Sequence, residues 1–364
     1  MGSETPQSTV HSIDEYLESK SWEHVIPLNV SMELTNRCNE RCIHCYIDFA
    51  KKGRELSFTE VTDTLDKLLE LKTLQIGFTG GELFLRPDIR DILRYARKKA
   101  FNFTLSTNGT LIDADTADFL KHVKPWDVGI SIYGSTPEKH EAITRLPGSY
   151  RRTVRAMELL LERNIRAKFK IVILKQNFDD YPNIKALADR LGAKVLLDFN
   201  ITPCNNGDKS PLDMNISDEQ VQQFMSNEEI GLDIYNMDQQ EYRKQKRLKL
   251  NGIMCKAGVN FMNITAFGDV TPCVQWVKPV GNIREQSLVD IWRTAPLFVK
   301  LRHTFWRDIP TCRDCAYIAY CNRCPGVAEM VDGDAFGISS MSCRYINNLK
   351  AVFKSRLNKD LVEA

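Results

Sequence analysis

Apolar and polar positions follow two different rhythms between about residue 28 and residue 205. Short apolar runs typical of strands lie at 29–35, 74–80, 101–108, 126–134, 167–174 and 193–201. Amphipathic stretches with helical spacing separate them, at 58–72, 88–100, 114–123, 150–164 and 180–192. Strands that alternate with helices predict right-handed βαβ units and a parallel sheet. Six such units indicate an α/β fold, either a curved, incomplete barrel or an open sheet, with chemistry at the carboxyl ends of the strands.

The pattern changes after residue 215. Residues 216–250 are charged and helical in spacing, whereas 251–345 are rich in loops, with short strands predicted at 260–267 and 269–275. Residues 251–345 contain little apolar sequence with a regular period, so this region could hardly bury a core of its own. We therefore expect metal clusters to supply cross-links. The predicted segments are an N-terminal extension 1–27, a barrel 28–215, a helical linker 216–250, a loop-rich domain 251–345 and a closing helix 346–364.

The composition is that of an ordinary globular protein. Of 364 residues, 43% are hydrophobic and 26% are charged, and the formal net charge of +2 offers no electrostatic case for nucleic acid or a membrane. No run of 18 or more apolar residues occurs, and the polar, acidic N-terminus lacks the basic region and apolar core of a secretory signal. We therefore expect a protein of the reducing cytoplasm, where disulfides are disfavoured.

The eleven cysteines are unevenly distributed along the chain. Three lie within 38–45 and seven within 255–343, while Cys204 stands alone between the two groups. In a reducing compartment, clustered cysteines indicate metal ligands before they indicate disulfides. Cys204 is either a buried thiol or, as a second reading, a further cluster ligand or an active-site group.

The first cysteine group, in TNRCNERCIHCY, follows directly on the first predicted strand. Three residues separate Cys38 from Cys42, and two separate Cys42 from Cys45. Three thiolates on a four-iron cluster leave one iron without a protein ligand, and an open metal position is what a reactive centre needs. The alternative is a zinc site with His44 as its fourth ligand. In the cluster interpretation, His44 lies beside the metal and takes no part in the chemistry.

This segment resembles the radical S-adenosylmethionine superfamily, whose hallmark is the same cysteine spacing followed by an aromatic residue, here Tyr46. The next strand ends in Gly80, Gly81 and Glu82, which resemble the family's Gly-Gly-Glu element. Two glycines let the backbone approach a ligand closely, and a glutamate complements an ammonium group. The resemblance implies that S-adenosylmethionine binds the open iron with its amino group at this element. One electron would then cleave it to a 5′-deoxyadenosyl radical that abstracts a substrate hydrogen.

Further positions resemble cofactor contacts of the same family. Ser106 and Asn108 stand at the end of the third predicted strand, and Ser131 at the end of the fourth. The resemblance implies hydrogen bonds from these residues to the ribose or the methionine carboxylate, and an ion pair of Arg145 with that carboxylate. The alternative is that they are ordinary turn residues and a surface arginine.

The C-terminal cysteine pattern resembles the SPASM domain, an extension of these enzymes that carries auxiliary 4Fe–4S clusters. The match includes the spacing of Gly268 from the next cysteine, and departs in having two residues instead of three between Cys321 and Cys324. The resemblance implies one cluster on Cys255, Cys273 and Cys324, and a second on Cys312, Cys315, Cys321 and Cys343. A zinc ribbon is the alternative, but its two cysteine pairs need a longer loop than the five residues present here.

The resemblance implies a partial (β/α)6 TIM-like barrel with a C-terminal iron–sulfur domain, and an oxidoreductase or maturase function. The leading hypothesis is modification of a ribosomally made peptide by a thioether or carbon–carbon cross-link, epimerisation or oxidation. The alternatives are a small-molecule enzyme, such as a tetrapyrrole side-chain decarboxylase, and a non-catalytic electron-transfer or sensor protein. Expected partners are the peptide, a separate leader-binding protein, and an electron donor such as flavodoxin or ferredoxin. The basic run 243–249 predicts a solvated helix face or a dock for an acidic peptide.

Overall fold

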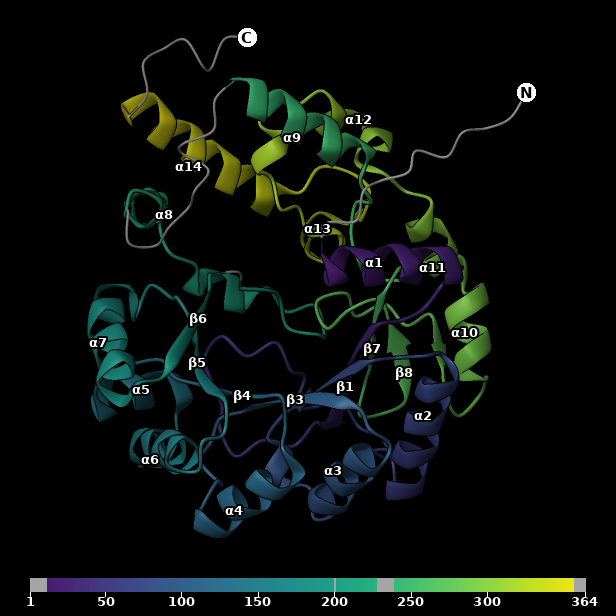
Figure 1. The fold of residues 1–364 in the computed structure, drawn as a ribbon. Coiled ribbons are helices and arrows are strands. Elements are labelled where there is room, and N and C mark those ends of the chain that lie inside the picture. Colours follow the sequence, from purple (N-terminus) through teal and green to yellow (C-terminus); the bar gives the residue numbers. More distant parts are fainter. Residues whose placement is uncertain (1–11, 200, 228–238, 357–364) are drawn as a thin grey trace.

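The computed structural model describes residues 12–199, 201–227 and 239–356. Six parallel strands form a curved sheet that does not close into a barrel (Figure 1). They lie where the apolar runs predict them: β1 (Asn29–Thr35), β2 (Gln75–Gly80), β3 (Asn102–Thr107), β4 (Asp127–Ser131), β5 (Ala167–Val172) and β6 (Lys194–Asp198). The predicted α/β fold with a partial barrel is therefore confirmed.

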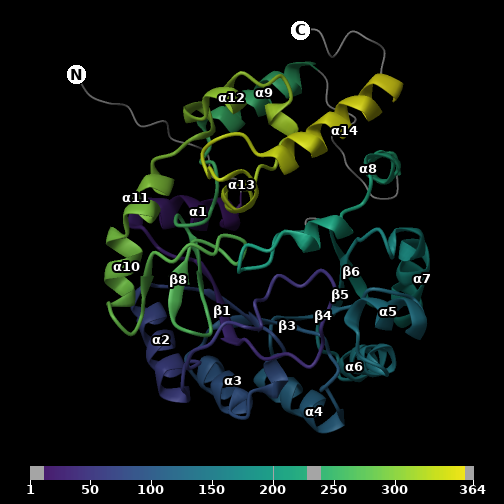
Figure 2. The ribbon, with the colours of Figure 1, turned by 180° about the vertical axis from the view of Figure 1, so that it is seen from behind.

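Helices cover one side of this sheet, as Figures 1 and 2 show from opposite directions. The predicted ones are α2 (Phe58–Glu70), α3 (Ile89–Lys98), α4 (Ala114–Val123), α6 (Ser149–Glu162) and α7 (Tyr181–Leu191). Two further helices beside the barrel strands were not predicted, α1 (Ile13–His24) and α5 (Pro137–Thr144), because neither has a marked apolar face. Short 3-10 turns lie at Leu83–Leu85, Phe178–Asp180, Ser210–Met214, Trp306–Asp308 and Ile318–Tyr320.

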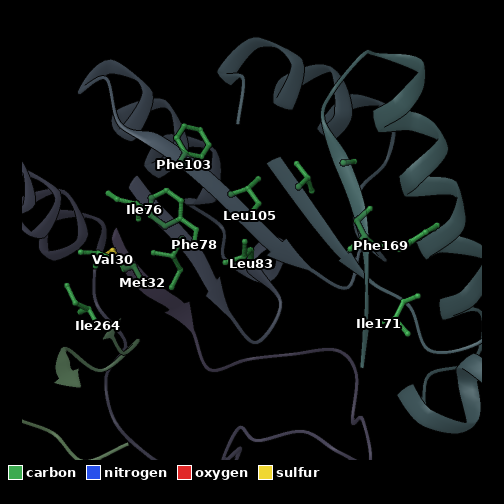
Figure 3. Packing of buried hydrophobic residues seen from close by; sticks show 14 of the residues in the cluster. Val30, Met32, Ile76, Phe78, Leu83, Phe103, Leu105, Phe169, Ile171 and Ile264 are labelled. Atoms are coloured by element: carbon green, nitrogen blue, oxygen red, sulfur yellow. The ribbon is translucent and has the colours of Figure 1, made fainter. Parts of the chain in front are cut away.

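Successive side chains of a strand point to opposite faces of the sheet, and here the two faces differ in kind. The face toward the helices is apolar and buried, with Phe78, Phe103 and Phe169 among its largest side chains (Figure 3). The other face carries small or polar residues such as Gly77 on β2 and Lys170 on β5. The helix-covered face is therefore the core, and the opposite face is free to line a cavity.

The C-terminal region extends the same sheet. Strand β7 (Phe261–Ile264) pairs in parallel with β1, and β8 (Asp269–Thr271) and β9 (Gly281–Asn282) continue the sheet in antiparallel fashion. The two short strands predicted at 260–267 and 269–275 are thus present as β7 and β8. Their pairing beside β1 joins the barrel and the cysteine-rich region into one nine-stranded sheet.

The C-terminal region also shares the core of the barrel. Ile264, Val270, Trp292 and Phe298 are buried in the same apolar cluster as the strands β1 to β5. The region 251–345 therefore shares the core of the barrel, and the cross-linking by metal clusters stays a prediction. The helices of this part are α10 (Leu288–Thr294), α11 (Pro296–Arg302), α12 (Pro310–Arg313), α13 (Pro325–Asp332) and α14 (Ser340–Arg356).

Between barrel and C-terminal region, the predicted linker 216–250 contains α8 (Asp218–Met225) and α9 (Gln239–Asn251). Residues 228–238 of that linker lie outside the described part, as do residues 1–11 of the predicted extension, residue 200 of the sixth strand run and 357–364 of the closing helix. Among the described residues, no helix is both long and apolar enough to cross a membrane.

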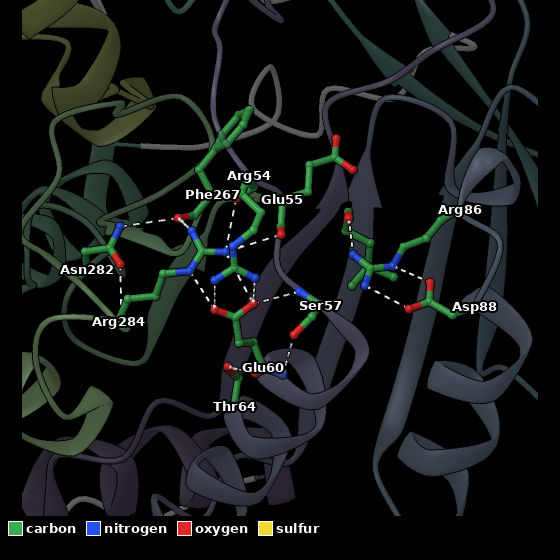
Figure 4. A network of polar contacts seen from close by, with 11 residues as sticks. Arg54, Glu55, Ser57, Glu60, Thr64, Arg86, Asp88, Phe267, Asn282 and Arg284 are labelled. Atoms are coloured by element: carbon green, nitrogen blue, oxygen red, sulfur yellow. Dashed lines mark hydrogen bonds and ion pairs between the residues drawn. The ribbon is translucent and has the colours of Figure 1, made fainter.

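A polar cluster fastens the C-terminal hairpin to the barrel (Figure 4). Glu60 and Ser57 form a capping box at the start of α2. The Glu60 carboxylate accepts hydrogen bonds from both Arg54 and Arg284, the latter at 2.6 Å. Arg284 also donates to main-chain carbonyls, including that of Phe267 at 3.0 Å. These paired guanidinium groups hold the pKa of the Glu60 carboxyl well below its usual range.

Candidate functional site

Two glycines at the end of β2 bring the first cysteine loop against the sheet. Gly80 has φ 133°, and a Cβ atom on it would lie 2.3 Å from the Thr35 carbonyl oxygen. A Cβ atom on Gly81 would lie 2.0 Å from the carbonyl oxygen of Arg37, the residue before Cys38. Any side chain at either position would displace this backbone, so the glycine pair determines how closely the loop approaches β2.

Backbone hydrogen bonds hold the loop in that position from both sides. On one side the Gly81 amide donates to Thr35 and the Glu82 amide to Arg37, both at 2.8 Å. On the other side the loop amides of Arg41 and Ile43 donate to carbonyls at the end of α5, at 3.0 and 3.1 Å. The cysteine loop is thereby fixed between β2 and α5.

The Glu82 carboxylate is buried and satisfied by the chain itself. It accepts from the Thr107 hydroxyl at 2.7 Å, from the Asn108 amide at 2.8 Å and from the Phe84 amide at 3.1 Å. Burial raises the pKa of Glu82. Its oxygens thus connect the ends of β2 and β3, and the direct contact with a cofactor ammonium remains a prediction.

A cavity of about 580 Å³ opens on the polar face of the sheet. It is lined by most of the residues predicted for the site, namely Cys38, Cys42, Cys45, Tyr46, Gly80, Gly81, Ser106, Asn108 and Ser131. Two predicted residues do not line it: Glu82 faces Thr107, and Arg145, which is exposed, follows α5. The proposed role of Arg145 at the methionine carboxylate therefore remains a prediction.

Several predicted residues are already oriented by the chain. Asn108 donates from its side chain to Asn39 at 2.8 Å, and the same nitrogen lies 3.9 Å from the Cys38 sulfur. Burial raises the pKa of the Tyr46 hydroxyl above the usual value. Its main-chain carbonyl accepts from the Asn205 amide at 2.7 Å. Asn108 and Tyr46 therefore brace the cysteine loop where it borders the cavity.

The donor set at this cavity suits an iron–sulfur cluster. Three thiols from one loop border one cavity, and soft sulfur ligands favour iron–sulfur centres. Burial raises the pKa of the Cys38 thiol to about 11 and raises those of Cys42 and Cys45 as well. Buried thiols of this kind stay protonated at neutral pH until a metal displaces the proton. His44 turns the edge of its ring to Tyr133, with centroids 4.7 Å apart, and its buried Nδ1 has no hydrogen-bond partner among the described residues.

The seven C-terminal cysteines form two groups in space. Cys255, Cys273 and Cys324 influence one another electrostatically, and burial raises the pKa of the Cys273 thiol to about 12. The second group has the same mutual influence and consists of Cys312, Cys315, Cys321 and Cys343. Each group is the set that the family resemblance implies for one auxiliary cluster, and the assignment of ligands remains a proposal. In the described part of the chain, no three His, Cys, Asp or Glu side chains are placed to share a single metal ion.

The first of these groups lies next to the cavity. Gln275 lines the cavity with Val274, and its side-chain oxygen lies 3.6 Å from the Cys324 sulfur. Cys204 belongs to neither C-terminal group and is buried beside Cys45, whose pKa its charge would raise. Sequence reasoning did not single out Gln275, because nothing in its local pattern shows which side of the loop faces the cavity.

Two family models match the chain. The model of the radical SAM superfamily matches residues 32–188, and the model of the SPASM iron–sulfur cluster-binding domain matches 255–325. An AdoMet-dependent heme synthase of Methanosarcina barkeri is 27% identical over 85% of this chain and 94% of the relative. The antilisterial bacteriocin subtilosin biosynthesis protein AlbA of Bacillus subtilis is 27% identical, over 84% and 69%. The PqqA peptide cyclase of Gluconobacter oxydans is 28% identical, over 79% and 82%.

Among solved structures, Streptococcus suis SuiB bound to its precursor peptide SuiA superposes with a TM-score of 0.69 at 16% identity. The match covers 91% of this chain and 80% of SuiB, so the two proteins share the fold over most of their lengths.

Proposed function

We propose that this chain, which belongs to the radical SAM superfamily and carries a SPASM domain, modifies a ribosomally made peptide. The observation that carries the proposal is the cavity shared by the two domains. The first cysteine loop borders it on one side, and Val274 and Gln275 of the SPASM domain border it on the other. Relatives named for bacteriocin biosynthesis and for peptide cyclisation support a peptide as the substrate.

The residues present fit the cofactors of this superfamily. Cys38, Cys42 and Cys45 would hold the 4Fe–4S cluster whose open iron binds S-adenosylmethionine. When bound, this pair supplies a 5′-deoxyadenosyl radical that abstracts a hydrogen atom from the substrate. The protein itself selects which hydrogen is presented, because the radical chemistry belongs to the cofactor.

The chain's own contribution is position and exclusion of water. Gly80 and Gly81 expose backbone to the cavity, and Ser106 and Ser131 present hydroxyl groups along its wall. The main-chain carbonyl of Tyr46, which accepts from Asn205, and the Asn108 side chain, which donates to Asn39, hold the cysteine loop in place. Groups held this rigidly lower the entropic cost of aligning a substrate hydrogen with the radical.

The SPASM cysteines would hold two auxiliary clusters, with Cys255, Cys273 and Cys324 on the one beside the cavity. An electron donor such as flavodoxin or ferredoxin would reduce the protein, and a separate protein would present the leader of the peptide. The reducing cytoplasm is part of this proposal, because the ligands must stay thiols until metal is loaded.

The proposal is tested on anaerobically reconstituted protein with a short peptide encoded beside the gene. We expect about twelve irons per chain, release of 5′-deoxyadenosine and methionine, and a mass change in the peptide. Replacing Cys38, Cys42 and Cys45 with Ala should remove about four irons and abolish 5′-deoxyadenosine release. The matched control is Cys204→Ala, which removes a buried cysteine outside the three groups and should keep all the irons. Iron that stays near four in the wild type, or zinc in its place, would contradict the auxiliary clusters.

A second candidate is a tetrapyrrole substrate, because the heme synthase match covers 94% of that relative. The same reconstituted protein is therefore incubated with a tetrapyrrole carboxylate and analysed for loss of carbon dioxide. A modified tetrapyrrole together with an unmodified peptide would replace the peptide proposal with this one. Release of 5′-deoxyadenosine in either assay rules out a purely electron-transferring or sensing protein.

A further inference from the structure

A lysine in the middle of β5 reaches into the shared cavity. Lys168 and Lys170 both lie on the polar face of this strand, because side chains two residues apart point the same way. The Lys170 ammonium lies 3.3 Å from the Ser106 hydroxyl, and both residues line the cavity. The stem of Lys170 crosses Gly129 on β4, where a Cβ atom would lie 2.6 Å from its Cδ atom. Glycine at 129 therefore makes room for the lysine.

Within the part of the chain that the structure describes, the charge of Lys170 has no direct counter-ion. Lys168 forms an ion pair with Asp127 at 3.1 Å, but the equivalent neighbour of Lys170 is Gly129, which carries no side chain. Among the described residues, no carboxylate lies within ion-pair distance of Lys170, and Asp198 and Asp127 act on it only from further away. A partly buried ammonium held by one hydroxyl is incompletely compensated for its lost hydration. An anionic ligand in the cavity would supply the missing partner.

We propose that Lys170 binds a carboxylate of the substrate inside the cavity and thereby selects a peptide with an acidic group near the modified residue. The carboxylate belongs either to an aspartate or glutamate side chain or to a free C-terminus. A charge-assisted hydrogen bond is short and directional, so it would also fix the distance of the substrate from the cysteine loop. The identity of the substrate rests on the proposed function, whereas the carboxylate site itself does not.

The first experiment uses the reconstituted enzyme and the precursor peptide. Lys170→Met keeps the length of the side chain and removes the charge, and it should raise the KM for the peptide by ten- to a hundred-fold while the Kd for S-adenosylmethionine changes by less than two-fold. Lys168→Met is the matched control, on the same face of the same strand, and should leave the KM within about two-fold because its charge is already paired with Asp127. Gly129→Ala, which displaces the stem of Lys170, should raise the KM in the same direction and keeps the test valid if Lys170→Met does not fold.

Peptide variants identify the carboxylate. Each acidic side chain is changed to its amide, and the C-terminus is amidated in a separate peptide. One of these changes should raise the KM of the wild type as Lys170→Met does, and should have no further effect on the Lys170→Met enzyme. If every peptide variant adds its effect to that of Lys170→Met, or if Lys170→Met weakens S-adenosylmethionine binding ten-fold or more, the proposal is overturned. The latter result would assign the lysine to the cofactor.

A second experiment separates failure of this site from failure of the proposed function. Reductive methylation of Lys170 is followed by mass spectrometry, with glutarate or its diamide present at equal concentration. Glutarate should slow methylation of Lys170 several-fold relative to the diamide, and neither should protect Lys168 selectively. Equal methylation with both compounds overturns the carboxylate site. Protection by glutarate without any modified peptide in the first experiment supports the site and rejects the peptide as substrate.

Discussion

Single atoms decide where the first cysteine loop lies. The space beside Gly81 is filled by main-chain atoms of the loop, which cannot move aside as the end of a flexible side chain can. The same contact explains why two glycines at the end of a strand mark this site in the sequence. In this structure their first role is to let two backbone segments touch, and the approach of a ligand depends on that contact.

Gly81→Ala is therefore expected to displace Cys38 and its neighbours. Overpacking of this kind typically costs about 1–3 kcal/mol, and we expect the variant to lose the irons of the first cluster, about four per chain. Iron analysis after anaerobic reconstitution and thermal unfolding measure the two effects. Gly77→Ala is the control on the same strand, because a Cβ atom there would meet nothing closer than 3.6 Å. Equal iron in both variants would contradict the role given to Gly81.

Glu33 on β1 makes stability depend on pH. Burial raises its pKa from 4.5 to about 7, and the Asn263 amide lies 3.3 Å away. Because the folded pKa is the higher one, the contribution of Glu33 to stability is complete below about pH 4.5 and is lost as the pH rises through about 7. Glu33→Gln stays neutral throughout. It should be as stable as the wild type near pH 5 and more stable at pH 8, by up to about 3 kcal/mol.

Thermal unfolding of the two proteins between pH 5 and pH 8 tests this expectation. The gap between the two melting temperatures should widen as the pH rises. A constant gap would mean that Glu33 does not titrate in this range.

At the scale of elements, the start of α2 is where the barrel and the C-terminal hairpin are fastened together. Arg284, beside β9, reaches the Glu60 carboxylate and the main-chain carbonyls of Arg54, Glu55 and Phe267 (Figure 4). A guanidinium with this many acceptors holds its position more firmly than an isolated surface pair. The polar cluster therefore orients the hairpin formed by β7 and β8, which precedes Cys273 in the chain.

Arg284→Met should lower the free energy of unfolding by about 1–3 kcal/mol, because it leaves several acceptors without a donor. Lys67→Met on α2, the helix that carries Glu60, is the comparison, since Lys67 and Glu70 form an exposed pair and its loss should cost at most about 1 kcal/mol. Chemical denaturation of both variants gives the two values. Similar losses in both would mean that the cluster around Glu60 is no stronger than a surface ion pair.

At the scale of the whole molecule, one sheet runs through both domains. Strand β7 lies against β1, so removing the C-terminal region would expose a long edge of the parallel sheet and part of the common core. Exposed edges and apolar surface of this kind lead to aggregation. The clusters and the sheet are therefore separate contributions to the stability of the C-terminal region.

Two altered forms of the chain separate these contributions. Replacing all seven SPASM cysteines with Ala keeps β7 to β9, and this protein should stay soluble and retain about four irons. A chain that ends at Asn251 lacks β7 and should aggregate, although it keeps the first cysteine loop and all six barrel strands. Size-exclusion chromatography and iron analysis compare the two. Aggregation of both would show that the auxiliary clusters, and not the shared sheet, hold the region together.

The barrel elements and the cysteine groups could be predicted from the sequence alone, because both depend on the spacing of residues that are close together in the chain. Alternating apolar positions place the six strands within a few residues of their ends, and the spacing of Cys38, Cys42 and Cys45 identifies the ligand loop. Helices α1 and α5 lack a marked apolar face, so local pattern could not reveal them, and α10 to α13 lie in a region that was predicted to be rich in loops.

Which residues from distant parts of the chain are in contact can be seen only in the tertiary structure. The pairing of β7 with β1, the enclosure of Glu82 by Thr107 and Asn108, and the passage of Lys170 over Gly129 all join segments far apart in the chain. Contacts of this kind depend on sheet order and register, which the local periodicity of a single strand does not encode. For the same reason the sequence could name the cavity's cysteines, while the place of Lys170 beside Ser106 in the cavity became visible only in the structure.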